Sequence, residues 1–152
     1  MKKMVIMAGL SGAGKSTVAR ARYAGLKTID CDELKKLCKG YDPLNPAAVH
    51  EESKRLERID LTKAICGDED FIYDTTATNA ERVVGIIKEA QEYGFWVELC
   101  YVKVSLKTAL ERNAKRERHV PEYIIREKNA VIGNALEILQ GYVDSFVTVV
   151  NE

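Results

Sequence analysis

The fold is decided by the stretch Gly9-Leu10-Ser11-Gly12-Ala13-Gly14-Lys15-Ser16-Thr17, which fits the pattern G-x-x-x-x-G-K-[ST]. An apolar run at 4–8 directly precedes it and a predicted helix follows, which is the context of a phosphate-binding loop. Its glycines let the backbone turn inward, so that successive N–H groups point at phosphate oxygens. The helix that begins near Lys15 adds the positive end of its dipole beneath the same phosphates. The stretch therefore predicts a binding site for a nucleoside triphosphate.

Two side chains of this loop have specific predicted roles. Lys15 can reach the β- and γ-phosphates and neutralise charge as a phosphoryl group leaves, and the Ser16 hydroxyl is placed to ligate Mg²⁺. We expect further nucleotide contacts from Gly9, Ser11, Gly12, Ala13, Gly14 and Thr17. The predicted cofactors are ATP, or another nucleoside triphosphate, and Mg²⁺. The alternative is a chance match in a Gly-rich turn, which the strand before and the helix after argue against.

Length and composition favour one soluble domain. The 152 residues, 46% of them hydrophobic, suffice for one packed core, so we expect a single domain over residues 1–152. The chain has 23 basic residues (Lys and Arg) and 23 acidic residues (Asp and Glu). Its formal net charge is zero, so we expect no long-range electrostatic attraction of the whole chain to nucleic acid or to an anionic membrane. No apolar run nears the roughly 18 to 20 residues that span a bilayer. The four cysteines lack zinc-site spacing and are typical of reduced thiols, so we expect a cytoplasmic protein.

Apolar runs and helical patterns alternate along the chain. The predicted strands lie at about 3–8, 27–29, 71–74, 95–104 and 145–150. The predicted helices lie at about 15–23, from Glu33 onward, and at about 47–65, 80–93, 105–118, 122–132 and 134–140. Strands that are apolar on both faces are typical of a parallel sheet covered on each side. This order predicts an α/β P-loop NTPase fold with a five-stranded parallel sheet, helices on both faces and a helical lid at about 105–132.

The second predicted strand delivers Asp30-Cys31-Asp32-Glu33 to the edge where a doubly wound sheet carries its ligands. If the phosphate acceptor is a hydroxyl, a nearby Asp can orient it and take its proton as the new bond to phosphorus forms. Asp32 is our candidate for this base. Alternatively, Asp30 or Asp32 caps the helix that starts near Glu33, because Asp is a preferred N-cap residue.

The third predicted strand ends in Tyr73-Asp74-Thr75. P-loop enzymes place at such a strand end the carboxylate that holds the Ser16-bound Mg²⁺ or its water. Asp74 is therefore the second predicted metal residue, and Thr75 is expected beside the acceptor. The alternative for Asp74 is an ordinary turn residue. Asn79 is predicted to cap the helix at 80–93.

Basic residues gather near the end of the chain. From 103 to 128 there are four Glu and eight basic residues, namely Lys103, Lys107, Arg112, Lys115, Arg116, Arg118, Arg126 and Lys128. Arg112 and Arg116 are four residues apart, so we expect both on one helical face, where they could clamp a polyphosphate as an internal arginine finger. The alternative is a solvated face with ion pairs such as Glu111 with Lys115. A solvated face is also predicted for Lys54, Arg55, Arg58 and Lys63.

Taken together, these stretches resemble the kinase domain of phage polynucleotide 5′-hydroxyl kinases, within the wider P-loop kinase group. The resemblance rests on 9–17, on Asp32, on Tyr73-Asp74-Thr75, and most specifically on Glu111-Arg112-Asn113-Ala114-Lys115-Arg116 followed by Val120-Pro121. It implies that Asp32 is the general base on a 5′-hydroxyl end of DNA or RNA. It also implies that Lys15, Arg112 and Arg116 hold the ATP phosphates, and that Asp74 and Ser16 organise the metal.

One position departs from that family. Where the family has an Arg three residues after its base, to help hold the phosphate of the nucleic acid, this chain has Lys35. Lysine keeps the positive charge but loses the bidentate fork, so the substrate strand could be recognised differently.

Three functions remain open from the sequence. The first is an ATP-dependent kinase that phosphorylates a nucleic-acid hydroxyl, most simply the 5′ end of DNA or RNA. The second is a kinase for another hydroxyl, such as a hydroxymethylated pyrimidine in phage DNA, a nucleoside or a small metabolite. The third is an ATPase switch, which usually orients an attacking water with Gln or Glu.

Overall fold

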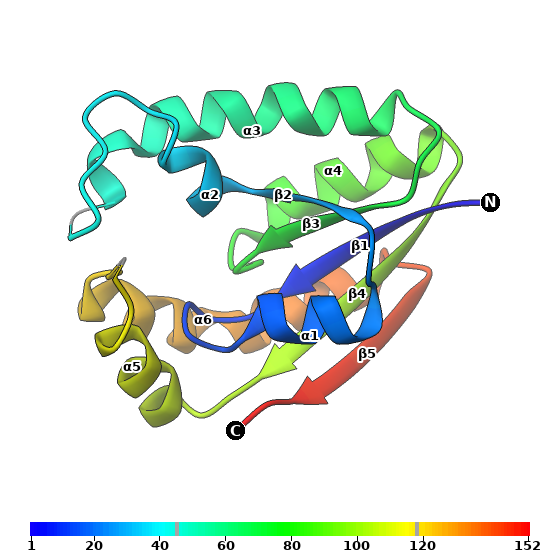
Figure 1. Ribbon diagram of the computed structural model, residues 1–152. Coiled ribbons are helices and arrows are strands. Elements are labelled where there is room, and N and C mark those ends of the chain that lie inside the picture. The colour runs from blue at the N-terminus through cyan, green and yellow to red at the C-terminus, as the bar shows by residue number, and fades with distance from the viewer. Residues whose placement is uncertain (45, 118) are drawn as a thin grey trace.

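The computed structural model describes residues 1–44, 46–117 and 119–152, and five parallel strands form its centre (Figure 1). In the order β2-β3-β1-β4-β5, β1 occupies the middle of the sheet. The strands are β1 (Lys2–Ala8), β2 (Lys27–Asp30), β3 (Phe71–Thr75), β4 (Phe95–Lys103) and β5 (Ser145–Val150). Every neighbouring pair is parallel, so each connection must cross over the sheet. The predicted five-stranded parallel sheet is confirmed.

Helices cover both faces of this sheet, as the sequence predicts. They are α1 (Lys15–Arg22), α2 (Cys31–Lys35), α3 (His50–Ile65), α4 (Ala80–Glu92), α5 (Leu106–Ala114) and α6 (Glu122–Gln140), with a 3-10 turn, η1 (Pro46–Val49), before α3. In Figure 1, α1 lies in front of the sheet, and α4 and α6 lie behind it. Helices α2 and α3 pack on each other beside the β2 edge. The α2–η1 segment and the α5–α6 segment both lie at the carboxyl ends of the strands.

Burial explains why β1 is central and β5 is an edge strand. The apolar residues from Met4 to Ala8 are fully buried, which is typical of a central parallel strand. Valine favours a buried β position, so the sequence predicts that Val150 is buried. Burial instead alternates along β5, and Val150 is 66% exposed. The prediction was wrong for Val150 because β5 pairs only with β4 in the described sheet.

Several predicted helix boundaries differ from the structure. Helix α3 begins at His50, because residues 46–49 form the 3-10 turn instead of its first turn. Helix α5 ends at Ala114, well before the expected end at 118. Arg118, one of the predicted basic residues, lies outside the described residues, as does Asn45.

The third difference concerns the segment that was predicted as two helices, at 122–132 and 134–140. The structure has one helix, α6, which runs through Gly133 without a break. Ile132, Leu136 and Leu139 are buried on one side of it, and this packing outweighs the low helix propensity of a single glycine.

Two further sequence expectations concern the surroundings of the protein. No helix within the described ranges has both the length and the apolar character needed to cross a bilayer. All four cysteines are unpaired thiols, and Cys38 and Cys100 are buried.

Candidate active site

The predicted phosphate-binding loop joins β1 to α1 at the carboxyl edge of the sheet. Gly12 and Gly14 have φ values of 89° and 86°, a left-handed conformation that glycine adopts without steric cost. A Cβ atom on Gly12 would lie 2.4 Å from the Ala109 carbonyl oxygen, and one on Gly14 would lie 2.2 Å from Asn151 Nδ2. Gly12 is therefore required by both the turn and the close approach of the α5 backbone, whereas Gly14 is required by its left-handed turn.

Side chains from distant parts of the sequence hold the carbonyl groups of this loop. Arg112 Nη1 donates to the carbonyl oxygens of Gly12 (3.4 Å) and Ala13 (3.3 Å). Asn151 Nδ2, just after β5, donates to the Ala13 oxygen at 2.8 Å. Asn151 was not predicted, because one asparagine near a strand end carries no recognisable pattern. The loop conformation thus depends on α5 and on the segment after β5.

Lys15 and Asp74 form an ion pair beneath the loop. The distance from Lys15 Nζ to Asp74 Oδ1 is 2.7 Å, and both side chains are largely buried. Burial alone would lower the pKa of Lys15, but the carboxylates of Asp74, Asp30 and Asp32 outweigh burial and raise this pKa above its usual value. Lys15 is therefore charged at neutral pH, as a phosphate ligand must be.

Asp30 is the residue that caps α2. Its carboxylate accepts a hydrogen bond from the Asp32 backbone N–H at 2.8 Å, and the helix begins at Cys31, two residues before the expected start at Glu33. The capping alternative left open by the sequence thus belongs to Asp30. Asp32 lies in the first turn of α2, and its Oδ1 is 3.6 Å from the Nζ of Lys35, which is only 8% exposed.

Asp30 also belongs to the carboxylate group at the sheet edge. It pairs in register with Asp74 on the adjacent parallel strand. Burial, reinforced by the negative charges of Asp74 and Asp32, raises the pKa of Asp30 to about 6. From the sequence, Asp30 was predicted only as a helix cap. The Asp-x-Asp pattern after a short strand was the signal that could have indicated a larger role.

A cavity of about 250 Å³ brings most of the predicted site residues together. It is lined by Leu10, Ser11, Gly12, Gly14, Lys15, Ser16, Asp30, Asp32, Asp74, Arg112 and Arg116. Nine of these were predicted as site residues, and Leu10 and Asp30 are additions. The loop, the α2 cap, the end of β3 and the α5–α6 segment therefore converge on one space.

Five predicted site residues do not line this cavity. Ala13 is fully buried, Thr17 is exposed on α1, and Lys35 lies beside Asp32. The Thr75 hydroxyl accepts a hydrogen bond from the Ala77 N–H at 3.2 Å, so it shapes the turn after β3. Gly9 packs so closely that a Cβ atom on it would lie 2.8 Å from the Val102 carbonyl oxygen.

Arg112 and Arg116 reach the cavity in a different way from the predicted one. The sequence placed both on one helical face, but α5 ends at Ala114 and Arg116 follows it in a turn. The turn is held by the Asn113 side chain, whose Nδ2 donates to the Val120 oxygen at 2.7 Å and whose Oδ1 accepts from the Val120 N–H at 3.0 Å. Asn113 thus folds the segment back, so that both arginines line the same space.

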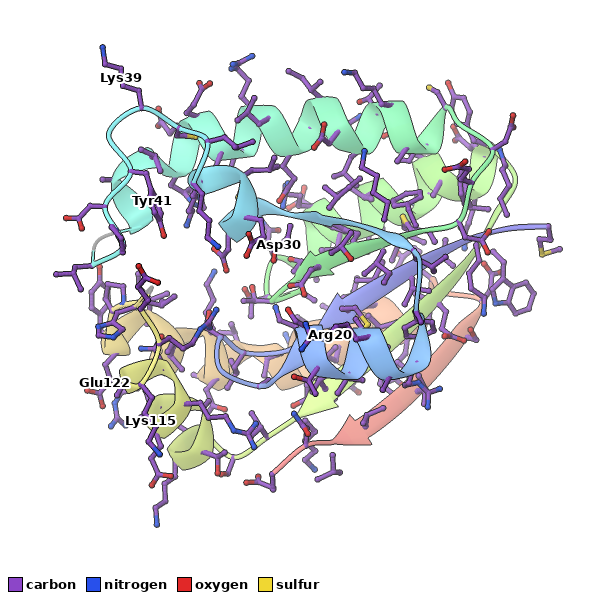
Figure 2. The ribbon with its side chains drawn as sticks, viewed as in Figure 1. Arg20, Asp30, Lys39, Tyr41, Lys115 and Glu122 are labelled. Atoms are coloured by element: carbon purple, nitrogen blue, oxygen red, sulfur yellow. The ribbon has the colours of Figure 1, made fainter. Side chains whose placement is uncertain are left out.

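A second cavity of about 490 Å³ adjoins the first and shares Ser16, Asp30 and Asp74 with it. It lies between α1 and the β2–β3 side of the sheet. Figure 2 shows two of its lining residues, Arg20 on α1 and Asp30 at the end of β2. The space beside the phosphate-binding loop is therefore large enough for part of a substrate as well as for phosphates.

The residues around the loop fit the predicted Mg²⁺. Ser16 and Asp74 line the same cavity, and the negative charge shared by Asp30 and Asp74 is of the kind that a divalent cation offsets. Within the described ranges, no three His, Cys, Asp or Glu side chains are placed to hold a metal ion by themselves. Mg²⁺ commonly uses one or two carboxylates together with waters and substrate phosphates, so this arrangement suits it.

The sequence of this chain matches a known protein family. Residues 4–133 match AAA_33, described as an AAA domain. The chain belongs to the AAA_33 family. This membership, together with the relatives below, confirms the predicted resemblance to P-loop kinases.

Among curated proteins, the AAA_33 chain is similar to one from Autographa californica nuclear polyhedrosis virus that is named as a bifunctional polynucleotide kinase/RNA ligase. The two are 30% identical over 133 residues, which are 79% of this chain and 19% of the viral protein. The chain thus spans about a fifth of the curated relative that it matches.

Solved structures share the fold at lower sequence identity. The AvrRxo1-ORF1:-ORF2 complex with ATP has a TM-score of 0.77 at 19% identity, covering 93% of this AAA_33 chain and 51% of that chain. A chain of the Pnkp1/Rnl/Hen1 RNA repair complex has a TM-score of 0.72 at 17% identity, covering 90% and 45%. Shikimate kinase from Acinetobacter baumannii has a TM-score of 0.63 at 16% identity, covering 98% and 84%. These likenesses establish the P-loop fold.

Proposed function

We propose that this protein is an ATP-dependent kinase that transfers the γ-phosphate to a hydroxyl of a nucleic acid, most simply the 5′-hydroxyl end of DNA or RNA. The observation that carries the proposal is the convergence of Lys15, Asp32 and the two arginines, Arg112 and Arg116, on one cavity. A phosphate loop, a carboxylate for the acceptor and cations for the transferring group are the parts that phosphoryl transfer to an alcohol requires.

Each residue has a distinct role in the proposed transfer. Asp32 accepts the hydroxyl proton as the acceptor oxygen bonds to the γ-phosphorus and the bond from that phosphorus to the β–γ bridging oxygen breaks. Lys15, Arg112 and Arg116 stabilise the negative charge on the phosphates, and ADP leaves. Ser16 and Asp74 would hold Mg²⁺, which supplies further charge neutralisation when bound.

The nucleic-acid acceptor is supported by the viral relative, whose name includes polynucleotide kinase, and by the likeness to a chain of an RNA repair complex. It is also supported by the Arg112–Arg116 segment that carries the family resemblance. We expect the reaction to take place in the cytoplasm, where ATP is available.

A second candidate is a P-loop kinase for another hydroxyl, such as a modified pyrimidine, a nucleoside or a small metabolite. The adjoining cavity of about 490 Å³ favours it, because the cavity could hold a small acceptor whole. The fold of this chain also resembles structures named as shikimate kinase and gluconokinase. A third candidate, the ATPase switch, would use a Gln or Glu to orient an attacking water, and Glu33 lines the adjoining cavity.

The two kinase candidates are separated by an acceptor screen. Purified protein, γ-labelled ATP and Mg²⁺ are incubated with a 5′-hydroxyl oligonucleotide, with duplex DNA containing hydroxymethylated pyrimidine, and with a panel of nucleosides and metabolites. Our proposal expects label on the 5′ end of the oligonucleotide. Label on an internal base or on a metabolite alone would favour the second candidate instead.

A further inference from the structure

The two edges of the sheet are protected to different degrees. Strand β2 forms one edge with only four residues, it begins at the exposed Lys27, and α3 packs on it. Short edge strands, lysines and covering helices are common ways in which proteins keep a sheet edge from pairing with another chain. Strand β5 forms the other edge with six residues, Ser-Phe-Val-Thr-Val-Val, and contains neither a charged residue nor a proline (Figure 1). The sequence of β5 therefore does nothing to discourage pairing.

The outer side of β5 presents backbone groups that can pair. In the described sheet, β5 is bonded only to β4. Directly after β5, the Asn151 N–H donates to the Lys103 carbonyl oxygen of β4 at 2.9 Å. In a parallel ladder, every second residue points both of its backbone groups at the same neighbour, so the odd-numbered residues of β5 face β4. The residues that direct N–H and C=O groups outward are Phe146, Thr148 and Val150.

These three residues also expose their side chains, which share one face of the sheet. Phe146 is 37% exposed, Val150 is 66% exposed, and Thr148 between them is exposed as well. Phe146 and Val150 lie at equal distances on either side of Thr148. The edge therefore shows the same order of side chains, apolar, hydroxyl and apolar, when it is read from either end.

The acidic residues that flank β5 do not oppose pairing. Asp144 Oδ2 accepts a hydrogen bond from the Val97 N–H of β4 at 2.8 Å. Glu152 Oε2 accepts from the Thr108 hydroxyl of α5 at 2.8 Å. Both carboxylates are thus bound within their own chain, on the side of β5 that faces β4.

We propose that β5 pairs in the antiparallel direction with β5 of a second copy of this chain, about a two-fold axis at Thr148. Phe146 then lies opposite the partner's Val150, and three residue pairs exchange about six backbone hydrogen bonds. Aromatic and β-branched residues form favourable cross-strand pairs. The equal spacing about Thr148 favours a second copy over a strand of another protein. Such a pairing is isologous, so it closes as a dimer and does not continue into a fibre.

The first test measures the dimer dissociation constant by analytical ultracentrifugation over a series of concentrations. We expect wild type to pass from monomer to dimer. Thr148→Lys places two like charges directly opposite each other at the axis, so the dissociation constant should rise at least about tenfold. Thr62→Lys is the matched control, because it makes the same change at an exposed position on α3, and it should leave the constant unchanged. Circular dichroism and thermal melting establish that each variant is folded.

A second test examines the register. In the proposed dimer Thr148 lies opposite itself in a hydrogen-bonded pair, where the Cα atoms are about 5.5 Å apart, a distance that a disulfide can bridge. Thr148→Cys should therefore form a covalent dimer under mild oxidation. Val150→Cys should not, because it lies opposite the partner's Phe146. Both variants carry Cys66→Ser, since the Cys66 thiol is exposed.

Three results would overturn the inference. The first is a wild type that stays monomeric over the whole series, and the second is unchanged dimerisation by folded Thr148→Lys. The third is equal cross-linking of Thr148→Cys and Val150→Cys, which would contradict the axis at Thr148. If monomeric wild type binds a synthetic peptide of residues 145–150, flanked by lysines for solubility, the edge accepts a strand from another protein instead of a second copy.

Discussion

The donor and acceptor sides of this site are built in opposite ways. On the donor side, one continuous loop presents its backbone, and Lys15 is the charged side chain that it adds to the cavity lining. On the acceptor side, the end of β2, the first turn of α2 and the end of β3 each contribute one carboxylate to the cavity, namely Asp30, Asp32 and Asp74. Backbone geometry depends on glycines at fixed spacing, whereas an assembly of side chains depends on how separate helices pack. The donor side is therefore easier to recognise in a sequence. The acceptor side is easier to alter by substitution of single side chains.

The largest expected effects come from one residue on each side. Lys15→Ala should lower turnover by about a thousandfold or more and also weaken ATP binding, because Lys15 neutralises the phosphates in both the ground state and the transition state. Asp32→Ala should lower turnover by about a hundredfold to ten-thousandfold and leave ATP binding intact, because a general base acts only on the acceptor. Steady-state kinetics and ATP titration of both variants check this. If Lys15→Ala and Asp32→Ala lose ATP affinity equally, Asp32 contributes to nucleotide binding and is not a base for the acceptor.

Arg112 links the two sides, so its replacement should rank next. It lines the cavity and donates to the Gly12 and Ala13 carbonyl oxygens. Arg112→Ala should lower kcat about a hundredfold, since it removes both a charge for the transferring phosphate and a support of the loop. Arg126→Ala is a suitable control, because Arg126 pairs with Glu122 at an exposed position. A similar loss of kcat in both variants would contradict a specific role for Arg112.

A methyl group on the loop tests the donor side alone. In Gly12→Ala the new Cβ atom meets the Ala109 carbonyl oxygen at 2.4 Å in a left-handed backbone conformation. We expect ATP affinity to fall about tenfold and stability to fall by about 1–3 kcal/mol. Gly85→Ala in α4 is the control, because its Cβ atom has open space and a helix favours alanine by about 0.5–1 kcal/mol. Unchanged ATP binding by folded Gly12→Ala would mean that the loop does not hold the triphosphate.

The smallest effect is expected from the amide that supports the loop from behind. Asn151→Ala removes the 2.8 Å hydrogen bond to the Ala13 carbonyl oxygen, which should cost about 1 kcal/mol, or a few-fold in ATP affinity. Acceptor KM should not change, because Asn151 does not line the cavity. ATP titration and an acceptor series measure the two effects. A larger change in acceptor KM than in ATP affinity would contradict the separation of the two sides.

The fold was largely readable from the sequence because its signals are local. The apolar run before Gly9 predicted the central strand, and Asn79 was correctly predicted to cap α4, where its side chain accepts the Arg82 N–H. The errors arose where packing overrides local preference. Helix α6 continues through Gly133 because apolar residues on either side are buried, and α5 ends at Ala114 while Asn113 turns the chain back.

The site was only partly readable, for a related reason. Lys15, Ser16 and Asp74 follow from the strand ends and from one motif. The role of Asn151 depends on a contact with Ala13 that spans most of the chain, and no spacing rule relates the two residues. Asp30 was predicted as a possible helix cap. Its position beside Asp74 could not be predicted, because it depends on the register between β2 and β3.

The central claim is that a triphosphate and an alcohol meet in the cavity between Lys15 and Asp32. The most direct test follows γ-labelled ATP with purified protein, Mg²⁺ and a 5′-hydroxyl oligonucleotide, for wild type and Asp32→Ala. We predict that wild type places the label on the 5′ end of the oligonucleotide and that Asp32→Ala, which still binds ATP, does not. The account would be contradicted if both wild type and Asp32→Ala released the label as inorganic phosphate, at a rate that does not depend on the presence of an alcohol acceptor.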